Sequence, residues 1–277
     1  MSKRRDLDRH LRSLREIRDI MNAMKNLALM ETHKLARVLP TQRRIVADIE
    51  SAAVDFFSFY PQFAGGDEPA NEICLLFGSE RGFCGDFNET ITQLAAKRAQ
   101  NLPCIVIGER LDDRMAADPR IVARISGPSV LEEVELVLLK LMEALETWQS
   151  IQQASKPLRP IVFHHQADAD VVKIASLHPS GSTKVAPATS GYPPRLNMEP
   201  HKFLSQFTEH YLFAALCVSF YDSLMAENQR RMQHMEYAVR RIEQDSEKLV
   251  LERNSLRQEE ITEEIEIIML SLQDVIV

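Results

Sequence analysis

Glycine and proline are absent from both ends of this 277-residue chain. All 9 glycines and all 13 prolines lie between Pro40 and Pro200. These two residue types most often end a helix, so residues 1–39 and 201–277 lack the usual stop signals. Both ends are therefore predicted to be long helices, and the chain between them is predicted to hold a different kind of structure.

Cysteine is scarce, and long apolar runs are missing. The cysteines show no CxxC spacing, which excludes a dense disulfide framework and favours buried thiols in a reducing compartment. No apolar run approaches the roughly 20 residues of a membrane span, and the N-terminal segment lacks the apolar core of a secretory signal. We expect a soluble chain whose membrane attachment is through partners. The four cysteines are Cys74, Cys84, Cys104 and Cys217.

Positive charge is not in excess. The formal net charge is −7, which excludes nucleic-acid binding by a globally basic surface. The hydrophobic content of 45% is ample for a packed core, so the chain is expected to fold and to have proteins as its partners.

The N-terminal segment from Ser2 to Leu39 repeats apolar residues at steps of three and four, which is typical of an amphipathic helix. Residues 201–277 show the same spacing, first on one stripe and then on a second stripe that is one position out of register. The first stripe contains Leu216, Phe220, Leu224, Met232, Met235, Val239, Ile242, Leu249 and Leu256, and the second contains Ile261, Ile265, Ile268, Leu272 and Val275.

The predicted C-terminal helix would be about 115 Å long at 1.5 Å per residue, which exceeds the radius of a compact domain of this size. A rod is therefore expected to project from the body. Two such helices cover each other's apolar stripes most simply as an antiparallel coiled coil. Residues 1–44 carry 12 Lys and Arg against 5 Asp and Glu, whereas residues 226–277 carry 7 against 12, so the helices are expected to attract each other.

Short β-rich runs separated by helical stretches fill the middle of the chain, and they predict a small, mostly parallel α/β sheet of Rossmann-like type. The helical candidates are Asn88 to Ala99 and Val130 to Gln153, and an exposed loop is expected from Pro179 to Pro200. The predicted organisation is a helix in residues 1–60, an α/β domain in 61–200 and a helix in 201–277, with the two helices forming one shaft. The predicted strands are Ile73 to Phe77, Cys104 to Ile107, Ile121 to Ile125, Ile161 to His164 and Val171 to Leu177.

The segment Gly78 to Asp86 follows the first predicted strand, where an α/β fold places a ligand. It matches neither GxGxxG nor GxxxxGK[ST], and Glu80 and Asp86 would repel a phosphate held only by backbone amides and Arg81. We interpret it as a structural turn in which Asp86 and Glu89 form a capping box for the next helix.

Other catalytic or metal-binding patterns are weak. The pair His164–His165 lacks the HExxH spacing of a zinc helix and is read as ordinary surface or edge histidine. Met21, Met24, Met232 and Met235 have helical spacing, which favours core packing over a cofactor role. We predict no enzymatic activity, no cofactor, no metal and no small-molecule substrate.

Four segments in order resemble the gamma subunits of rotary F-type ATP synthases. Residues 20–28, IMNAMKNLA, resemble that family's ITKAMKMVA, and residues 79–88, SERGFCGDFN, resemble SDRGLCGGLN. Residues 198–200, MEP, resemble YEP, and residues 256–265, LRQEEITEEI, are similar to ARQAAITQEI. The segments span almost the whole chain and follow the same plan of helix, α/β body and helix.

The resemblance implies a central rotor shaft that couples ion translocation through a membrane sector to ATP synthesis or hydrolysis. The terminal helices would lie on the axis of a ring of alpha and beta subunits. The body would lie near the epsilon subunit and the c-ring, on the cytoplasmic side of the bacterial inner membrane. The ATP chemistry would belong to the partners.

The resemblance also assigns residues. Arg257 and Gln258 would contact a beta subunit, with Met24 and Lys25 nearby on the opposing helix. Arginine suits this role because its planar guanidinium can bind a carboxylate through two parallel bonds. Leu196, Met198 and Glu199 would belong to the foot that contacts the membrane rotor.

The departures from the family pattern indicate a divergent member, of an alternative ion-pumping branch. Glu259 and Glu260 replace small residues, Glu263 replaces Gln, and Leu196 and Met198 replace tyrosines. Two other classes of function stay open at the level of the residues. One is a nucleotide-binding enzyme with a dimerising coiled coil, and the other is a free coiled-coil adaptor. The coupled ion, H⁺ or Na⁺, and the direction of the reaction are not encoded in these motifs.

Overall fold

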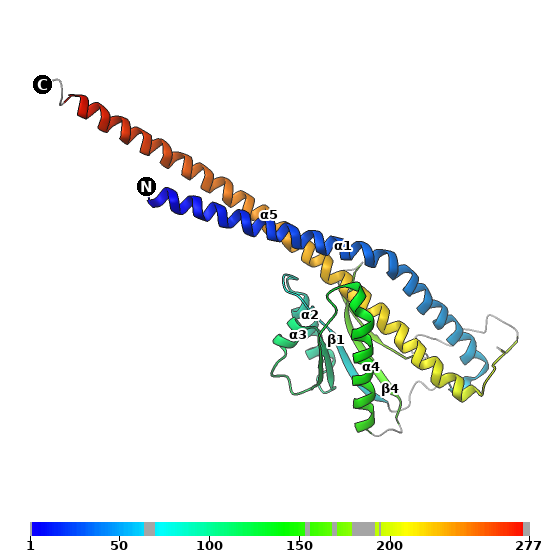
Figure 1. Cartoon of the computed structure of the whole chain (residues 1–277). Coiled ribbons are helices and arrows are strands. Elements are labelled where there is room, and N and C mark those ends of the chain that lie inside the picture. Colours follow the sequence, from blue (N-terminus) through cyan, green and yellow to red (C-terminus); the bar gives the residue numbers. More distant parts are fainter. Residues whose placement is uncertain are drawn as a thin grey trace. The chain divides into compact units, whose positions relative to one another are not determined.

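A computed structural model describes residues 2–63, 70–152, 156–167, 171–178, 192–193 and 195–273 (Figure 1). Two compact units make up the chain. The first, here called the helix pair, consists of residues 1–27 and 232–277, and the second, here called the body, consists of residues 28–231. Helix α1, Ser2–Phe59, and helix α5, Pro200–Gln273, each contribute to both units.

The body contains a five-stranded sheet in the order β3-β2-β1-β4-β5. Three of the four strand pairings are parallel, and the pairing of β4 with β5 is antiparallel, which confirms the predicted mostly parallel sheet. The strands are β1, Asn71–Phe77; β2, Cys104–Ile107; β3, Ile121–Ile125; β4, Leu158–Gln166; and β5, Val171–Ser176.

Strand β1 lies at the centre of the sheet and is buried on both faces. Its alternate residues enter two different cores, as the two-residue period of a strand requires. Ile73, Leu75 and Phe77 join the core on the side of α4, Val134–Ile151, and α5. Cys74 and Leu76 join the core on the side of α2, Phe87–Arg98.

The predicted helices of the body are confirmed as α2 and α4, each within a few residues of the expected ends. The sequence patterns missed α3, Glu109–Arg114, because six residues are too few to show a helical period. Two short 3₁₀ helices complete the described elements, at Pro61–Phe63 and Leu131–Glu133.

Helix α1 does not end at Leu39. It continues through Pro40 to Phe59, beyond the amphipathic segment that was read to Leu39, and agrees with the predicted helix in residues 1–60. A proline inside a helix costs about 3 kcal/mol because it removes a hydrogen bond and crowds the preceding turn. Here the residues beyond it bury Ala53, Phe56 and Phe57 in an aromatic cluster, and this burial favours continuing the helix. Phe56 stacks on Tyr60, with ring centroids 4.9 Å apart.

Helix α5 places one apolar stripe in the core of the body. Leu212, Leu216, Phe220 and Leu224 recur at four-residue steps and are all buried. The Phe220 ring stacks on Phe77 of the sheet at a centroid distance of 4.3 Å. The first part of the predicted C-terminal stripe is thus a core face.

The helix pair is antiparallel, as its ion pairs show. Lys25 pairs with Glu236 at 3.7 Å, Asp8 with Arg253 at 3.7 Å, and Arg4 with Glu260 at 2.6 Å. Residue numbers fall along α1 as they rise along α5, which confirms the predicted antiparallel pairing and its charge complementarity. The fold is therefore a long antiparallel coiled coil with a Rossmann-like α/β body.

Beyond Glu260, the residues of the second apolar stripe that the structure describes are about half exposed. Ile261, Ile265 and Ile268 are 45%, 51% and 56% exposed. Val275 and the side chain of Leu272, which were predicted to continue this stripe, lie outside the described residues, as does most of the loop predicted from Pro179 to Pro200.

Candidate functional site

The turn that follows β1, residues 78–86, lies at the carboxyl end of the sheet. Gly78 is required by packing, because a Cβ atom there would lie 2.2 Å from the Cβ of Leu111. Two residues in the turn have left-handed backbone, Phe83 and Gly85, each with φ of 63°. Glycine tolerates this region, but for other residues it costs about 1–2 kcal/mol. The backbone at Phe83 is therefore strained and must be held by its surroundings.

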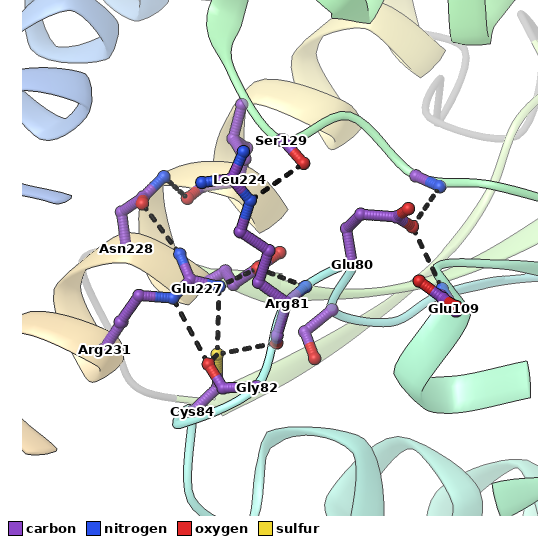
Figure 2. A network of polar contacts seen from close by, with 12 residues as sticks. Glu80, Arg81, Gly82, Cys84, Glu109, Ser129, Leu224, Glu227, Asn228 and Arg231 are labelled. Atoms are coloured by element: carbon purple, nitrogen blue, oxygen red, sulfur yellow. Dashed lines mark hydrogen bonds and ion pairs between the residues drawn. The ribbon is translucent and has the colours of Figure 1, made fainter. Parts of the chain in front are cut away.

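Glu80 occupies the position where an α/β fold of this type would bind an anion. One carboxylate oxygen, Oε2, accepts hydrogen bonds from the amide of Gly127 at 2.6 Å and from the amide of Glu109 at 3.0 Å (Figure 2). These amides follow β3 and β2, at the carboxyl ends of parallel strands. The chain's own carboxylate therefore uses the donors that a phosphate would need. This agrees with the interpretation of the segment as structural.

The predicted capping box is not formed. The Asp86 side chain makes no capping hydrogen bond at the start of α2, and its Oδ1 instead accepts from Nη1 of Arg230 at 2.5 Å. A serine or threonine side chain is the usual cap of such a box. Asp86 turns away because a guanidinium on α5 gives its carboxylate a charged partner.

A buried polar network joins this turn to α5 (Figure 2). Arg231 donates to the carbonyl oxygen of Gly82 at 3.3 Å, to the sulfur of Cys84 at 3.3 Å and to Oδ1 of Asn228 at 2.9 Å. It also forms an ion pair with Glu227, whose Oε1 accepts from the backbone amide of Arg81 at 3.4 Å. The side chains of Arg231 and Glu227 are only 6% and 5% exposed.

Electrostatics in this network are governed by burial. Burial raises the pKa of Glu227 although Arg231 acts in the opposite direction. Burial also raises the pKa of the Cys84 thiol to about 12, so Cys84 is not an activated nucleophile. Cys74, Cys84 and Cys104 are buried thiols as predicted, whereas Cys217 is only partly buried.

The interpretation of His164 and His165 as surface or edge residues was wrong. They are 2% and 1% exposed on β4, which has a strand on each side. Burial, together with the positive charges of Lys173 and Arg43, lowers the pKa of His164 to about 4. His165 stacks on Phe87 at 3.9 Å, and its Nε2 lies 2.9 Å from the Phe87 carbonyl oxygen. Both histidines are core residues.

The residues proposed to contact a beta subunit lie at two levels of the helix pair. Arg257 and Gln258 are exposed on α5, close in sequence to Glu260, which pairs with Arg4. Lys25 pairs with Glu236, which lies about 30 Å from Arg257 along the helix at 1.5 Å per residue. The expectation that Met24 and Lys25 lie near Arg257 was therefore wrong, because the antiparallel register places the first turns of α1 there.

The residues proposed for the foot are divided in the body. Leu196 is partly buried and packs against the cluster of Ala53, Phe56 and Phe57. Met198 is 42% exposed, and Glu199 is exposed, with its side chain 3.7 Å from Lys202. Met198 and Glu199 are thus available to a partner, whereas Leu196 mainly supports the fold.

Sequence reasoning missed Glu227 and Arg231, although a signal was present. The apolar stripe of α5 runs through Phe220 and Leu224 and is interrupted before Met232. Within this gap, Glu227 follows Leu224 by three residues and Arg231 follows Glu227 by four. Charged residues within an apolar stripe indicate a buried, paired site.

The described residues contain no group of three or more His, Cys, Asp or Glu residues placed to hold a metal ion. Among the helices that the structure describes, none has a segment both long and apolar enough for a membrane crossing.

Comparisons with known proteins agree on one family. The family profile described as ATP synthase matches residues 3–271. A rotor chain of the Euglena gracilis mitochondrial ATP synthase is 13% identical, with a TM-score of 0.62 over 94% of this chain and 99% of that chain. A second chain, from a structure of the Euglena OSCP, F1 and c-ring, is 14% identical, with a TM-score of 0.64 over 99% of this chain and 95% of that one.

A chain from the central stalk and c-ring of the Tetrahymena thermophila mitochondrial ATP synthase is 18% identical, with a TM-score of 0.58 over 79% and 99% of the two chains. No curated protein sequence matches significantly. At these identities, the structural likenesses concern the fold.

Proposed function

Because this chain belongs to the ATP synthase family of gamma subunits and is a central-stalk rotor subunit, we propose that it acts without an active site of its own. It couples ion translocation through the membrane sector to ATP synthesis or hydrolysis in a catalytic ring of alpha and beta subunits. Its partners on the rotor are the epsilon subunit and the c-ring. The chain itself is peripheral and lies on the cytoplasmic side of a bacterial inner membrane.

The use of Glu80 supports the absence of catalysis. In a nucleotide-binding enzyme, the amides of Glu109 and Gly127 would face a phosphate. Here they bind the carboxylate of Glu80, at 3.0 Å and 2.6 Å. A bound nucleotide would have to displace an internal, charge-assisted pair of hydrogen bonds. The alternative of a nucleotide-binding enzyme is therefore disfavoured.

The exposed apolar surface of the helix pair is the observation that carries the proposal of a surrounding ring. Ile261, Ile265 and Ile268 are about half exposed near the end of α5, and Ile267 and Met269 are 66% and 62% exposed. Large exposed apolar surfaces mark protein interfaces. A free coiled-coil adaptor would not need this stripe, whereas a shaft enclosed by other subunits would bury it.

Two contact regions complete the proposal. Arg257 and Gln258 bind loops of a beta subunit through polar contacts, and Met24 and Lys25 contact the ring at a different height of the shaft. Met198 and Glu199 face the c-ring, and Leu196 holds that segment on the body. Exposure of Arg257, Gln258, Met198 and Glu199 supports these roles.

Co-purification tests the proposal. The chain is co-expressed with the alpha, beta and epsilon subunits from the same genome, and the tagged beta subunit is isolated. We expect the chain to co-purify in a complex that hydrolyses ATP, and we expect the chain alone neither to hydrolyse nor to bind ATP.

The variant Arg81→Ala serves as a control for the turn, because Arg81 is the one arginine in residues 78–86 that could face a nucleotide. ATP binding by the chain alone that is lost in Arg81→Ala would favour the enzyme alternative. A folded chain that never associates with alpha and beta would favour the adaptor.

A further inference from the structure

The turn Arg81–Cys84 and helix α5 contact each other through directional polar bonds. Arg231 reaches the Gly82 carbonyl oxygen and the Cys84 sulfur, each at 3.3 Å, while Glu227 accepts from the Arg81 amide at 3.4 Å. On the turn, the Gly82 carbonyl oxygen and the Arg81 amide are backbone groups, so these bonds hold the main chain of the turn and not only its side chains. Within the body, α5 is thus tied to the segment that directly follows the central strand β1.

Other contacts hold the turn to the sheet. The Glu80 carboxylate binds the amides after β2 and β3, and the Nε of Arg81 donates to the hydroxyl of Ser129 at 3.1 Å. Ser79 and Asn88 exchange two buried hydrogen bonds, each of 2.9 Å. These bonds hold the turn to the carboxyl end of the sheet, here called the sheet edge. Glu227 and Arg231 then connect α5 to this sheet edge.

Stability alone does not explain a buried ion pair at this position. Removing two charges from water carries a large desolvation penalty, and apolar residues of similar volume are often neutral or stabilising replacements. Burial raises the pKa of Glu227, which is consistent with such a penalty. What apolar packing lacks is direction, because hydrophobic contact depends on area while hydrogen bonds depend on angle and distance. A polar pair fixes register where an apolar contact could slide.

We propose that Glu227 and Arg231 are positioning residues that lock α5 to the sheet edge, so that the body and α5 turn together and ion transport stays in step with ATP turnover. This inference rests on the proposed function. In a rotor, torque between the body and α5 has to cross their side-by-side contacts. The lock supplies contacts that resist sliding of the helix past the turn.

Two double variants separate the lock from a simple stabilising pair. Glu227→Leu with Arg231→Met removes the polar contacts and keeps apolar volume. Glu227→Arg with Arg231→Glu keeps an ion pair between these positions but breaks the contacts with the turn. A carboxylate at 231 cannot donate to the Gly82 carbonyl oxygen, and a guanidinium at 227 cannot accept from the Arg81 amide.

The matched control is Asp86→Asn with Arg230→Gln. This pair also joins the turn to α5, and the side chains of Arg230 and Asp86 are 14% and 72% exposed. Because the Asp86 carboxylate lies in water, the pair is screened and contributes less than a buried pair. All variants are assembled into the membrane-bound complex. ATP hydrolysis and the ATP-driven membrane potential are measured together, the latter with a voltage-sensitive dye that responds to either H⁺ or Na⁺.

The expected result is a drop in membrane potential generated per ATP hydrolysed for both double variants, by about 2- to 30-fold, the range for residues within a coupling network. Hydrolysis itself continues, and the control keeps the parental ratio. A parental ratio in the charge-reversed variant would overturn the lock and leave only a helix-stabilising ion pair. A parental ratio in the Leu/Met variant would overturn it as well.

If the double variants fail to assemble, Arg231→Lys tests whether the contacts of Arg231 with the turn are needed for coupling. Lysine keeps the positive charge beside Glu227 but lacks the fork of donors that reaches Gly82, Cys84 and Asn228 together. The expected result is an assembled complex with a partly reduced ratio, and an unchanged ratio would overturn the proposal. Failure of the proposed function would look different, since the parental chain itself would then not be needed for ATP-driven membrane potential.

Discussion

The body and the helix pair use charged residues in opposite ways. In the body, the side chains of Glu227 and Arg231 are 5% and 6% exposed and bind backbone atoms of a strained turn. In the helix pair, the side chains of Arg4 and Glu260 are 44% and 27% exposed. Buried polar groups fix one arrangement, whereas exposed ion pairs orient two helices at little cost to either.

The apolar residues show the same contrast. The body buries Phe77, Phe220 and their neighbours almost completely, while the helix pair exposes Leu251 and Ile267 at 69% and 66%. A unit that buries its large apolar residues can be stable by itself. A unit that exposes them presents a surface that partners can cover. The body therefore carries its own core, whereas the helix pair presents exposed apolar residues that a partner could cover.

The largest expected effect comes from the core of the body. Phe220→Ala should lower the free energy of unfolding of the body by about 3–5 kcal/mol, because it leaves a cavity beside Phe77. Trp148 is the single tryptophan and lies in the same core, so its fluorescence in a urea titration reports unfolding of the body. Leu251→Ala in the helix pair is the control and should shift this transition by no more than about 0.5 kcal/mol. Equal shifts of the unfolding transition in Phe220→Ala and Leu251→Ala would show that the two units do not differ in this respect.

The next effect concerns the proposed partner surface. Arg257→Ala with Gln258→Ala should reduce ATP turnover of the complex, since truncating a desolvated charged contact across an interface costs about 2–5 kcal/mol. Both side chains are exposed, so the chain itself should remain folded by circular dichroism. Single and double variants test whether the two residues act together. Parental turnover by the double variant would show that both positions are merely solvated.

A pH effect on the stability of the body is expected from the buried His164. The pKa of His164 is lowered to about 4, so the unfolded chain binds more protons at this position between pH 4 and the ordinary pKa of 6.5. The stabilisation from neutral His164 is therefore complete above pH 6.5 and is lost as the pH falls toward 4, by about 3 kcal/mol in total.

Urea titrations followed by Trp148 fluorescence at several pH values measure this loss. His164→Gln should flatten the acid dependence of body stability, whereas His10→Gln, at an exposed position of the helix pair, should not. An unchanged acid dependence in His164→Gln would mean that another group dominates.

The smallest effect is expected in the ion pairs of the helix pair. Arg4→Gln should change stability by about 0.2–1 kcal/mol, as for other exposed pairs, and the change should shrink further at high salt. Thermal melting followed by circular dichroism at low and high salt measures it. A change of several kcal/mol would show that these exposed charges act like the buried pair of the body.

Most of the fold could be predicted from local sequence because apolar residues in both units recur at regular helical or strand spacing. The five strands and the helices α2 and α4 could be predicted from apolar spacing. The antiparallel pairing could be predicted from the charges of residues 1–44 and 226–277. The helix predicted in residues 1–60 is found as Ser2–Phe59, although local propensity at Pro40 favours a helix end. Burial of Phe56 and Phe57 later in the same helix favours its continuation.

The candidate site was less predictable because its contacts join distant parts of the chain. Glu80 was read as repelling an anion, but the same carboxylate fills the anion's position by binding Glu109 and Gly127. The register of the helix pair, which separates Lys25 from Arg257, depends on where α1 begins relative to α5 and not on either stripe alone.

Rotation of this chain within a catalytic ring can be observed in single complexes. The ring is immobilised through its beta subunits, and a visible probe is attached to the body through a cysteine introduced at the exposed residue Lys97. We expect continuous rotation in one direction when ATP is added, and arrest when ATP is removed. A probe that stays fixed while the same complexes hydrolyse ATP at an undiminished rate would contradict it.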